Sequence, residues 1–285
     1  MSLRFDWSKM GRTRPTALVE ARNLAHHALQ WATRAARANL QPAPDDSHSA
    51  LTWDAEHAAL LSRPLPAKGG DVRAGLRIAR LELIITRGAN VLDAFQYEGK
   101  TDAAAGAWVE AKLKSLGLKS AGMARLPYAM AEHPLAAGKP HELAMLGREL
   151  GELSRWFGGG AEALESFRSG LRQASPGPVL CWPHHFDIAT LVALEGGHPA
   201  NARSVGVGVS PGDEYYAQPY VYVSPWPRID PAGLPEAPSP GRWHTQDFIG
   251  AVATGEEILA LKDRAGGILG FINAAFEISR ARVTA

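Results

Sequence analysis

Residues 181–227 constrain the fold most, because short apolar and aromatic runs alternate there with turn-forming residues. The runs read CWPHHFDIATLVAL, SVGVGVSPGDEYY and QPYVYVSPWP. Alternation with a period of two, interrupted by the turn signal Pro-Gly-Asp at 211–213, predicts β-hairpins. The same span gathers two Trp-Pro pairs, adjacent histidines and a tyrosine-rich strand. Side chains of this kind on short strands favour a ligand pocket over a plain core.

The first half of the chain has the pattern of a helix, three strands and a second helix. Apolar residues three and four apart predict a helix over 15–40, and QPAPDDSHS at 41–49 predicts a turn-rich loop. Extended runs predict strands over 51–61, 76–86 and 91–97. Thr101 is the expected cap of a helix that ends near Gly117.

The second half repeats this order. Helices are expected over 143–153, stopped by the glycines at 158–160, and over 164–171. Strands are expected over 179–194, 204–209 and 219–224, with a fourth around 243–252. Thr254 and Glu257 have the spacing of a capping box that starts the last helix.

The repeated order predicts an α+β fold of two α-β-β-β-α halves, 1–120 and 121–285. The halves are expected to share one mostly antiparallel sheet, with helices packed on it, in one compact unit. An internal duplication explains the repetition, and a coincidental order of elements is the alternative.

Composition argues against several classes of protein. The 285 residues are 46% hydrophobic and 21% charged, as in ordinary globular proteins. A net charge of +1 gives no field that would attract nucleic acid or anionic lipid, so neither partner is expected. No apolar run suits a signal peptide or a membrane span, which predicts a cytoplasmic protein. The single cysteine, Cys181, excludes a disulfide framework and is expected to be a small buried hydrophobe.

His185 and Asp187 are the candidate catalytic residues. In a strand their side chains share one face, whereas His184 points to the other. An imidazole beside a carboxylate can act as a general base, but Asp187 can also serve only to satisfy a buried group. Further possible metal ligands are Asp213, Glu214 and His244. Because these donors lack diagnostic spacing, neither a metal nor a cofactor is expected.

Aromatic side chains predict the ligand-binding pocket, since Tyr and Trp combine a large apolar area with one polar tip. The predicted lining residues are Trp182, His184, Asp213, Tyr220, Tyr222, Trp226 and His244. The proline-rich loop at 225–240 is either a lid or a passive surface excursion. The alternative to a pocket is a sheet-on-helix core in which the hydroxyl groups bond to the backbone.

Gly206 and Gly208 alternate with valines in the run SVGVGVS. Because glycine has no side chain, one face of this strand is expected to be smooth enough for another backbone or a flat ligand to approach. No helix follows directly, so the run is not a phosphate-binding loop.

Three motifs of the second half resemble an uncharacterised bacterial family known only as a domain of unknown function. They are HFDIATLVAL, the Ser204–Gly206 element followed by Pro211-Gly212, and the strand end Pro-Tyr-x-Tyr-x-x-Pro-x-Pro. Phe186 and Asp187 match the family's Phe-Asp pair. His184 and His185 stand where the family more usually has small residues, so the resemblance implies that a two-histidine metal site is not a family property. It implies no activity.

These observations favour a small-molecule-binding protein with an aromatic and histidine-lined pocket. One alternative is an enzyme, a hydrolase or an isomerase, that uses His185 and Asp187 with or without a metal. A second is a structural or interaction protein in which these residues belong to the core. A small molecule is the expected partner, and a homo-oligomer stays open.

Overall fold

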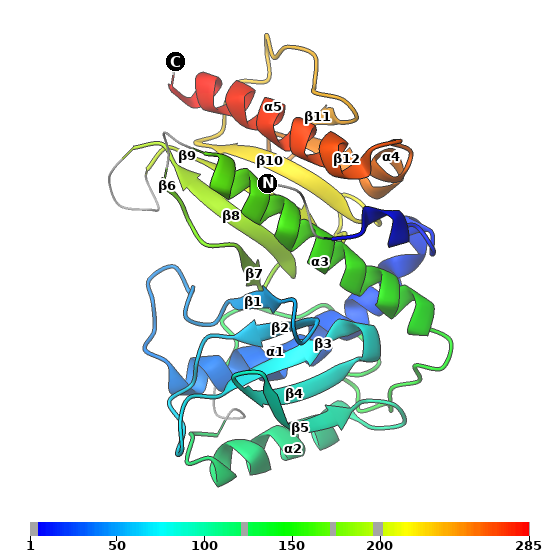
Figure 1. Ribbon diagram of the computed structural model, residues 1–285, viewed down its shortest axis with the longest axis vertical. Coiled ribbons are helices and arrows are strands. Elements are labelled where there is room, and N and C mark those ends of the chain that lie inside the picture. The colour runs from blue at the N-terminus through cyan, green and yellow to red at the C-terminus, as the bar shows by residue number, and fades with distance from the viewer. Residues whose placement is uncertain (1–4, 121–124, 172–174, 196–201, 285) are drawn as a thin grey trace. The chain divides into compact units, whose positions relative to one another are not determined.

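The computed structural model describes residues 5–120, 125–171, 175–195 and 202–284, which form two compact units (Figure 1). The β1–β5 unit comprises Leu18–Ser154 and Leu180–Phe186. The β8–β12 unit comprises Met1–Ala17, Arg155–Val179 and Asp187–Ala285. These boundaries are not those of the predicted halves, and the division into domains at residue 120 stays a prediction.

The β1–β5 unit is an antiparallel sheet with helices. Its helices are α1 (Val19–Asn39) and α2 (Asp102–Ser115), and its strands are β1 (Leu51–Asp54), β2 (Ala59–Ser62), β3 (Arg73–Arg77), β4 (Glu82–Arg87), β5 (Asn90–Gln96) and β7 (Leu180–Trp182). The strands lie in the order β7-β1-β2-β3-β4-β5. The side chain of Thr101 accepts a hydrogen bond from the amide of Ala104, which confirms the predicted cap of α2.

Two predicted strands of this unit are hairpins. The segment 51–61 contains β1 and β2, and the segment 76–86 contains β3, a 3-10 turn (Ile78–Arg80) and β4. Ala58 (φ 48°) and Leu81 (φ 43°) lie in the left-handed region at these reversals. Alanine and leucine rarely adopt positive φ, and no glycine or asparagine marks either reversal. The sequence therefore carries no turn signal at these positions, and the alternation pattern missed both.

The β8–β12 unit is also antiparallel. Its strands are β6 (Ser175–Pro176), β8 (Asp187–Ala193), β9 (Ser204–Ser210), β10 (Tyr220–Trp226), β11 (Arg242–His244) and β12 (Gly250–Thr254), and its helices are α4 (Gly255–Leu259), α5 (Arg264–Thr284) and the part of α3 (Gly147–Gly170) from Arg155 onward. The strands lie in the order β11-β12-β10-β9-β8, with β6 beside β8. The α+β class with antiparallel strands is therefore confirmed.

Helix α3 continues through the glycines at 158–160, so the predicted stop there is wrong. A Cβ atom on Gly159 would lie 3.0 Å from the rings of Phe5 and Trp7, and one on Gly160 would lie 3.0 Å from Val209 of β9. These glycines allow the helix to pack closely against its neighbours. The sequence showed their poor helix propensity but not this packing.

The C-terminal segments differ from prediction in two places. The strand expected around 243–252 is two strands, β11 and β12, with Asp247 (φ 51°) between them. The capping box of Thr254 and Glu257 is confirmed, but its helix α4 ends at Leu259. Asp263 then accepts a hydrogen bond from the amide of Gly266, as an N-cap residue does, and α5 begins as a new helix.

The two faces of the β8–β10 sheet differ. Val205, Val207 and Val209 of β9 are buried, and Val209 lies against α3. Helix α5 packs on β9, β10 and β12, and Figure 1 shows α3 and α5 on the viewer's side of these strands. Side chains that alternate with the valines, including Tyr222 opposite Gly208, therefore lie on the face away from α3.

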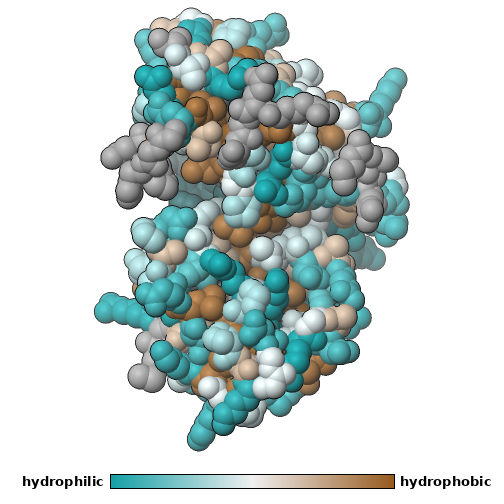
Figure 2. All heavy atoms as spheres, turned by 60° about the vertical axis from the view of Figure 1, so that its left-hand side comes forward, coloured by the Kyte–Doolittle hydropathy of each residue, from teal (hydrophilic) through white to brown (hydrophobic). Residues whose placement is uncertain are grey.

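Hydrophobic residues on the molecular face seen in Figure 2 form small separate patches among hydrophilic ones. Within the described ranges, no helix combines the length and the apolar character that crossing a membrane requires. Cys181 is fully buried in β7, as expected.

Candidate functional site

Three tyrosines form a row in the β8–β12 unit, which we call the tyrosine row: Tyr216, Tyr220 and Tyr222. Tyr220 and Tyr222 share one face of β10, with ring centroids 6.0 Å apart. Tyr216 precedes the strand, and its ring centroid lies 4.9 Å from that of Tyr220. The row therefore runs from the middle of β10 into the β9–β10 loop.

Each hydroxyl group of the tyrosine row bonds to an ionisable side chain. Tyr222 donates to Oδ2 of Asp187 at 2.5 Å, and Tyr220 donates to Oδ2 of Asp213. The hydroxyl of Tyr216 lies 3.0 Å from Nδ1 of His244. These partners differ from the backbone groups that a plain core would supply.

Burial and the neighbouring carboxylates keep two of these hydroxyl groups neutral. Burial, followed by the charge of Asp187, raises the pKa of Tyr222 well above its usual value. Burial and Asp213 raise the pKa of Tyr220 in the same way. Asp187 is itself only 7% exposed. The row thus presents protonated phenols as donors to two carboxylates, of which Asp187 is nearly buried.

Gly208 determines where the Tyr222 ring lies. The two residues are directly opposite in β9 and β10, and a Cβ atom on Gly208 would lie 2.5 Å from the Tyr222 ring. The smooth strand face expected at Gly208 is therefore occupied by a side chain of the same sheet. Gly206 faces more open space, because its nearest neighbour would be the carbonyl oxygen of Ser224 at 3.7 Å.

A second group of rings adjoins the tyrosine row, and we call it the aromatic end: Tyr215, Tyr216, His244 and Phe248. His244 stacks on Phe248 with ring centroids 4.1 Å apart, and Tyr215 contacts both rings edge-on at 5.3 and 5.4 Å. Tyr215 is 39% exposed. Nε2 of His244 is buried and has no hydrogen-bond partner among the described residues.

The β1–β5 unit holds the histidine turn, residues 183–186. Nε2 of His26 and Nε2 of Gln30, both on α1, lie 2.8 and 3.0 Å from the carbonyl oxygen of Pro183. The His26 ring stacks on Phe186, whose φ of 58° reverses the chain. Burial lowers the pKa of His26 to about 4. The neutral imidazole therefore donates to Pro183 and fixes the turn on α1.

The turn corrects the expected orientation of the two adjacent histidines. His184 and His185 are in the turn rather than in a strand, and their ring centroids are only 4.1 Å apart. They therefore do not face opposite ways. Trp182 and Tyr128 flank His184 with ring centroids at 6.2 and 5.8 Å. Partial burial, followed by the charge of His185, lowers the pKa of His184 to about 4.

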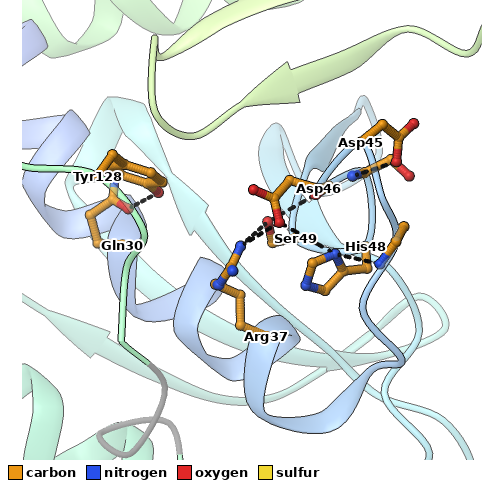
Figure 3. A network of polar contacts seen from close by, with 9 residues as sticks. Gln30, Arg37, Asp45, Asp46, His48, Ser49 and Tyr128 are labelled. Carbon is orange, nitrogen blue, oxygen red and sulfur yellow. Dashed lines mark hydrogen bonds and ion pairs between the residues drawn. The ribbon is translucent and has the colours of Figure 1, made fainter. Parts of the chain in front are cut away.

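A polar network near this turn was not anticipated (Figure 3). Tyr128 donates to Oε1 of Gln30 at 2.7 Å. Arg37 donates to Oδ1 of Asp46 at 3.0 Å and to Oγ of Ser49 at 3.2 Å. The sequence signal for the ion pair was present, since an arginine in the last turn of a helix preceded an acidic loop.

The predicted site residues are divided between the two units. Asp187, Asp213, Tyr220, Tyr222 and His244 belong to the β8–β12 unit, whereas Trp182, His184 and His185 belong to the β1–β5 unit. Trp226 ends β10 and is 53% exposed. A pocket common to all of them stays a prediction.

His185 and Asp187 do not share a strand face as predicted, because His185 lies in the turn and β8 begins only at Asp187. A catalytic pairing of the two therefore stays a prediction without that support. The residues missed in the β8–β12 unit are Tyr215, Tyr216 and Phe248. Tyr215 and Tyr216 form a doublet in the sequence, but a loop has no periodicity from which to predict their orientation.

Two further features bear on ligands. In the part of the chain that the structure describes, no three His, Cys, Asp or Glu side chains are arranged to hold a metal ion. A crevice lined by Trp156, Phe157, Ile188, Val209 and Pro211 is apolar. It lies at the helix-covered valine face and leaves no space for a molecule the size of water.

No protein-family model, curated protein or solved structure matches this chain. The resemblance of the HFDIATLVAL region to an uncharacterised family therefore stays a proposal.

Proposed function

We propose that this chain is a small-molecule-binding protein whose ligand lies against the tyrosine row and the aromatic end. One observation carries the proposal: three neighbouring hydroxyl groups, two on one face of β10 and one in the loop before it, all bond to ionisable side chains, Asp187, Asp213 and His244. Burying such groups costs free energy, and a core needs only apolar side chains at these positions. Clusters of this kind are typical of binding and catalytic sites.

The aromatic end supplies rings that a ligand can contact. Tyr215 is exposed, and the rings beside it are held at fixed distances. Rigid aromatic rings provide contact area at a small cost in conformational entropy. Nε2 of His244 is buried and has no hydrogen-bond partner among the described residues, so a ligand group that enters between the rings can bond to it.

A thermal-shift screen of metabolites, followed by fluorescence titration, tests the proposal. Trp226 ends β10 and Trp243 directly precedes His244 in β11, so tryptophan fluorescence is expected to report binding at this site. A ligand at one hundred times its Kd raises the stability of its unit by about 2.7 kcal/mol. We expect Tyr216→Phe to weaken binding by about tenfold, since the hydroxyl group positions His244.

Tyr128→Phe is the matched control, because it removes a bonded tyrosine hydroxyl from the other unit. It is expected to leave the affinity unchanged. Equal weakening by both variants, or a screen in which no compound binds, would contradict the proposal.

We also propose that the halves 1–120 and 121–285 arose by duplication. The order helix, antiparallel strands, helix occurs in α1, β1 to β5 and α2, and again in α3, β8 to β12 and α5, with two differences: β12 lies between β10 and β11 in the second sheet, and α4 precedes α5. Superposition of experimental structures of the halves tests this. Unrelated strand order or direction would contradict it.

A cytoplasmic location and a homo-oligomeric state likewise stay predictions.

A further inference from the structure

Three carboxylates adjoin the aromatic end in the chain, because Asp213 and Glu214 precede Tyr215 and Asp247 precedes Phe248. Besides burial, the negative charges of Asp247, Glu214 and Asp213 raise the pKa of Tyr215. Oδ1 of Asp213 also accepts hydrogen bonds from the amides of Tyr215 and Tyr216, at 2.9 and 3.1 Å. The same carboxylate therefore fixes the backbone that carries two of the rings and contributes charge next to them.

The cations near this end already have partners. Arg242 forms an ion pair with Glu257. Arg228 donates to the carbonyl oxygens of Asp247 and Thr245, at 3.1 and 3.4 Å. Among the described residues, the carboxylates at 213, 214 and 247 outnumber Arg228, which bonds to carbonyl oxygens, so the aromatic end has an excess of negative charge.

This combination selects one class of ligand. The face of an aromatic ring attracts a cation through its quadrupole, and nearby carboxylates add Coulomb attraction. Anionic ligands are repelled by the same charges. A neutral apolar ligand gains only the contact area and nothing from the charges.

Building on the proposed function, we propose that the ligand of this site carries an organic cation, an alkylammonium group that lies against Tyr215, His244 and Phe248. Asp213, Glu214 and Asp247 supply the opposite charge. The exposure of Tyr215 leaves the site open to solvent, so binding is expected to weaken as salt screens the carboxylates.

Choline and its neutral isostere 3,3-dimethylbutan-1-ol provide the decisive comparison, because they differ by one charge at nearly constant shape. Each is titrated into the whole protein while tryptophan fluorescence is recorded, with isothermal calorimetry as a second measurement. We expect choline to bind saturably and about tenfold more tightly than the isostere.

Two variants locate the binding. Tyr215→Leu removes an exposed ring, and Asp247→Asn removes one charge at a left-handed position that asparagine tolerates. Each is expected to weaken choline binding by about fivefold. Glu236→Gln, an exposed acid in the loop after β10, is the charge-matched control and is expected to have no effect.

The outcomes separate the two proposals. Equal affinity for choline and its isostere overturns the cationic class but leaves the site. Absence of choline binding, together with a screening hit that depends on Tyr216, overturns the cationic class and supports the proposed function. No binding by any compound overturns both. Choline binding that is unchanged in Tyr215→Leu and Asp247→Asn overturns the location.

Discussion

At the scale of single residues, Gly208 is a position in β9 where the sheet leaves no room for a side chain. A methyl group there would meet the Tyr222 ring at 2.5 Å, whereas at Gly206 the nearest atom is 3.7 Å away. We expect Gly208→Ala to lower the free energy of unfolding by about 1–3 kcal/mol, the usual cost of overpacking. Gly206→Ala is the matched control in the same strand and is expected to be tolerated.

Urea denaturation of the two variants checks this prediction. Equal midpoints for both would show that the Tyr222 ring moves aside without cost. The comparison also reports on the site, because displacement of Tyr222 would separate its hydroxyl group from Asp187.

The bond between Tyr222 and Asp187 gives a second prediction at this scale. Tyr222→Phe leaves Oδ2 of a nearly buried carboxylate without its phenol donor. Hydrogen bonds to charged groups contribute about 1.5–3 kcal/mol, so a loss of that order is expected in the free energy of unfolding. Tyr215→Phe, at an exposed ring, is the control and should be close to neutral. A neutral Tyr222→Phe would mean that water replaces the phenol.

At the scale of elements, the capping box of Thr254 and Glu257 fixes the start of α4. The side-chain carboxylate of Glu257 accepts from the amide and the hydroxyl group of Thr254, both at 2.8 Å. We expect Thr254→Ala to cost about 0.5–2 kcal/mol, the range found for loss of an N-cap. Thr245→Ala, in the exposed loop before β12, is the control. Equal urea midpoints for the two variants would contradict a stabilising cap.

Elements that local chemistry defines were predictable from the sequence. The periodic apolar face of α1, the Thr101 cap and the Thr254 box each act within a few residues. Elements that depend on distant partners were not. Gly159 and Gly160 indicated a helix end, and only the nearness of Trp7 and Val209 explains why the helix continues.

In the candidate site, too, local arrangements were predictable from the sequence and those that depend on distant residues were not. Tyr220 and Tyr222 on one strand face were predictable from alternation, and the structure confirms that arrangement. The partner of Tyr216 was not predictable, because it depends on a loop and on β11, 28 positions further along the chain. His185 was misplaced for a related reason, since a left-handed Phe186 ends the turn where the sequence pattern continued a strand.

At the scale of the whole molecule, acid is expected to destabilise the β1–β5 unit. The pKa of His26 is about 4 in the folded protein, below the usual 6.5 of an imidazole, because burial disfavours the charged ring. Below pH 6.5 the unfolded chain therefore binds a proton that the folded chain does not. The contribution of His26 to the free energy of unfolding is fully present above pH 6.5. It is lost as the pH falls toward 4, by about 1.4 kcal/mol per pH unit.

Urea denaturation between pH 7.5 and 4.5 measures this slope, and His26→Gln isolates the contribution of one residue. Glutamine keeps an N–H group that can donate to Pro183 but cannot bind a proton in this range. The variant should therefore approach the wild type in stability at pH 7.5 and lose less of it on acidification. Parallel curves would show that His26 is protonated in the folded state. The histidine turn, and with it the placement of His184 and His185, would then depend on a charged ring and not on the neutral donor described above.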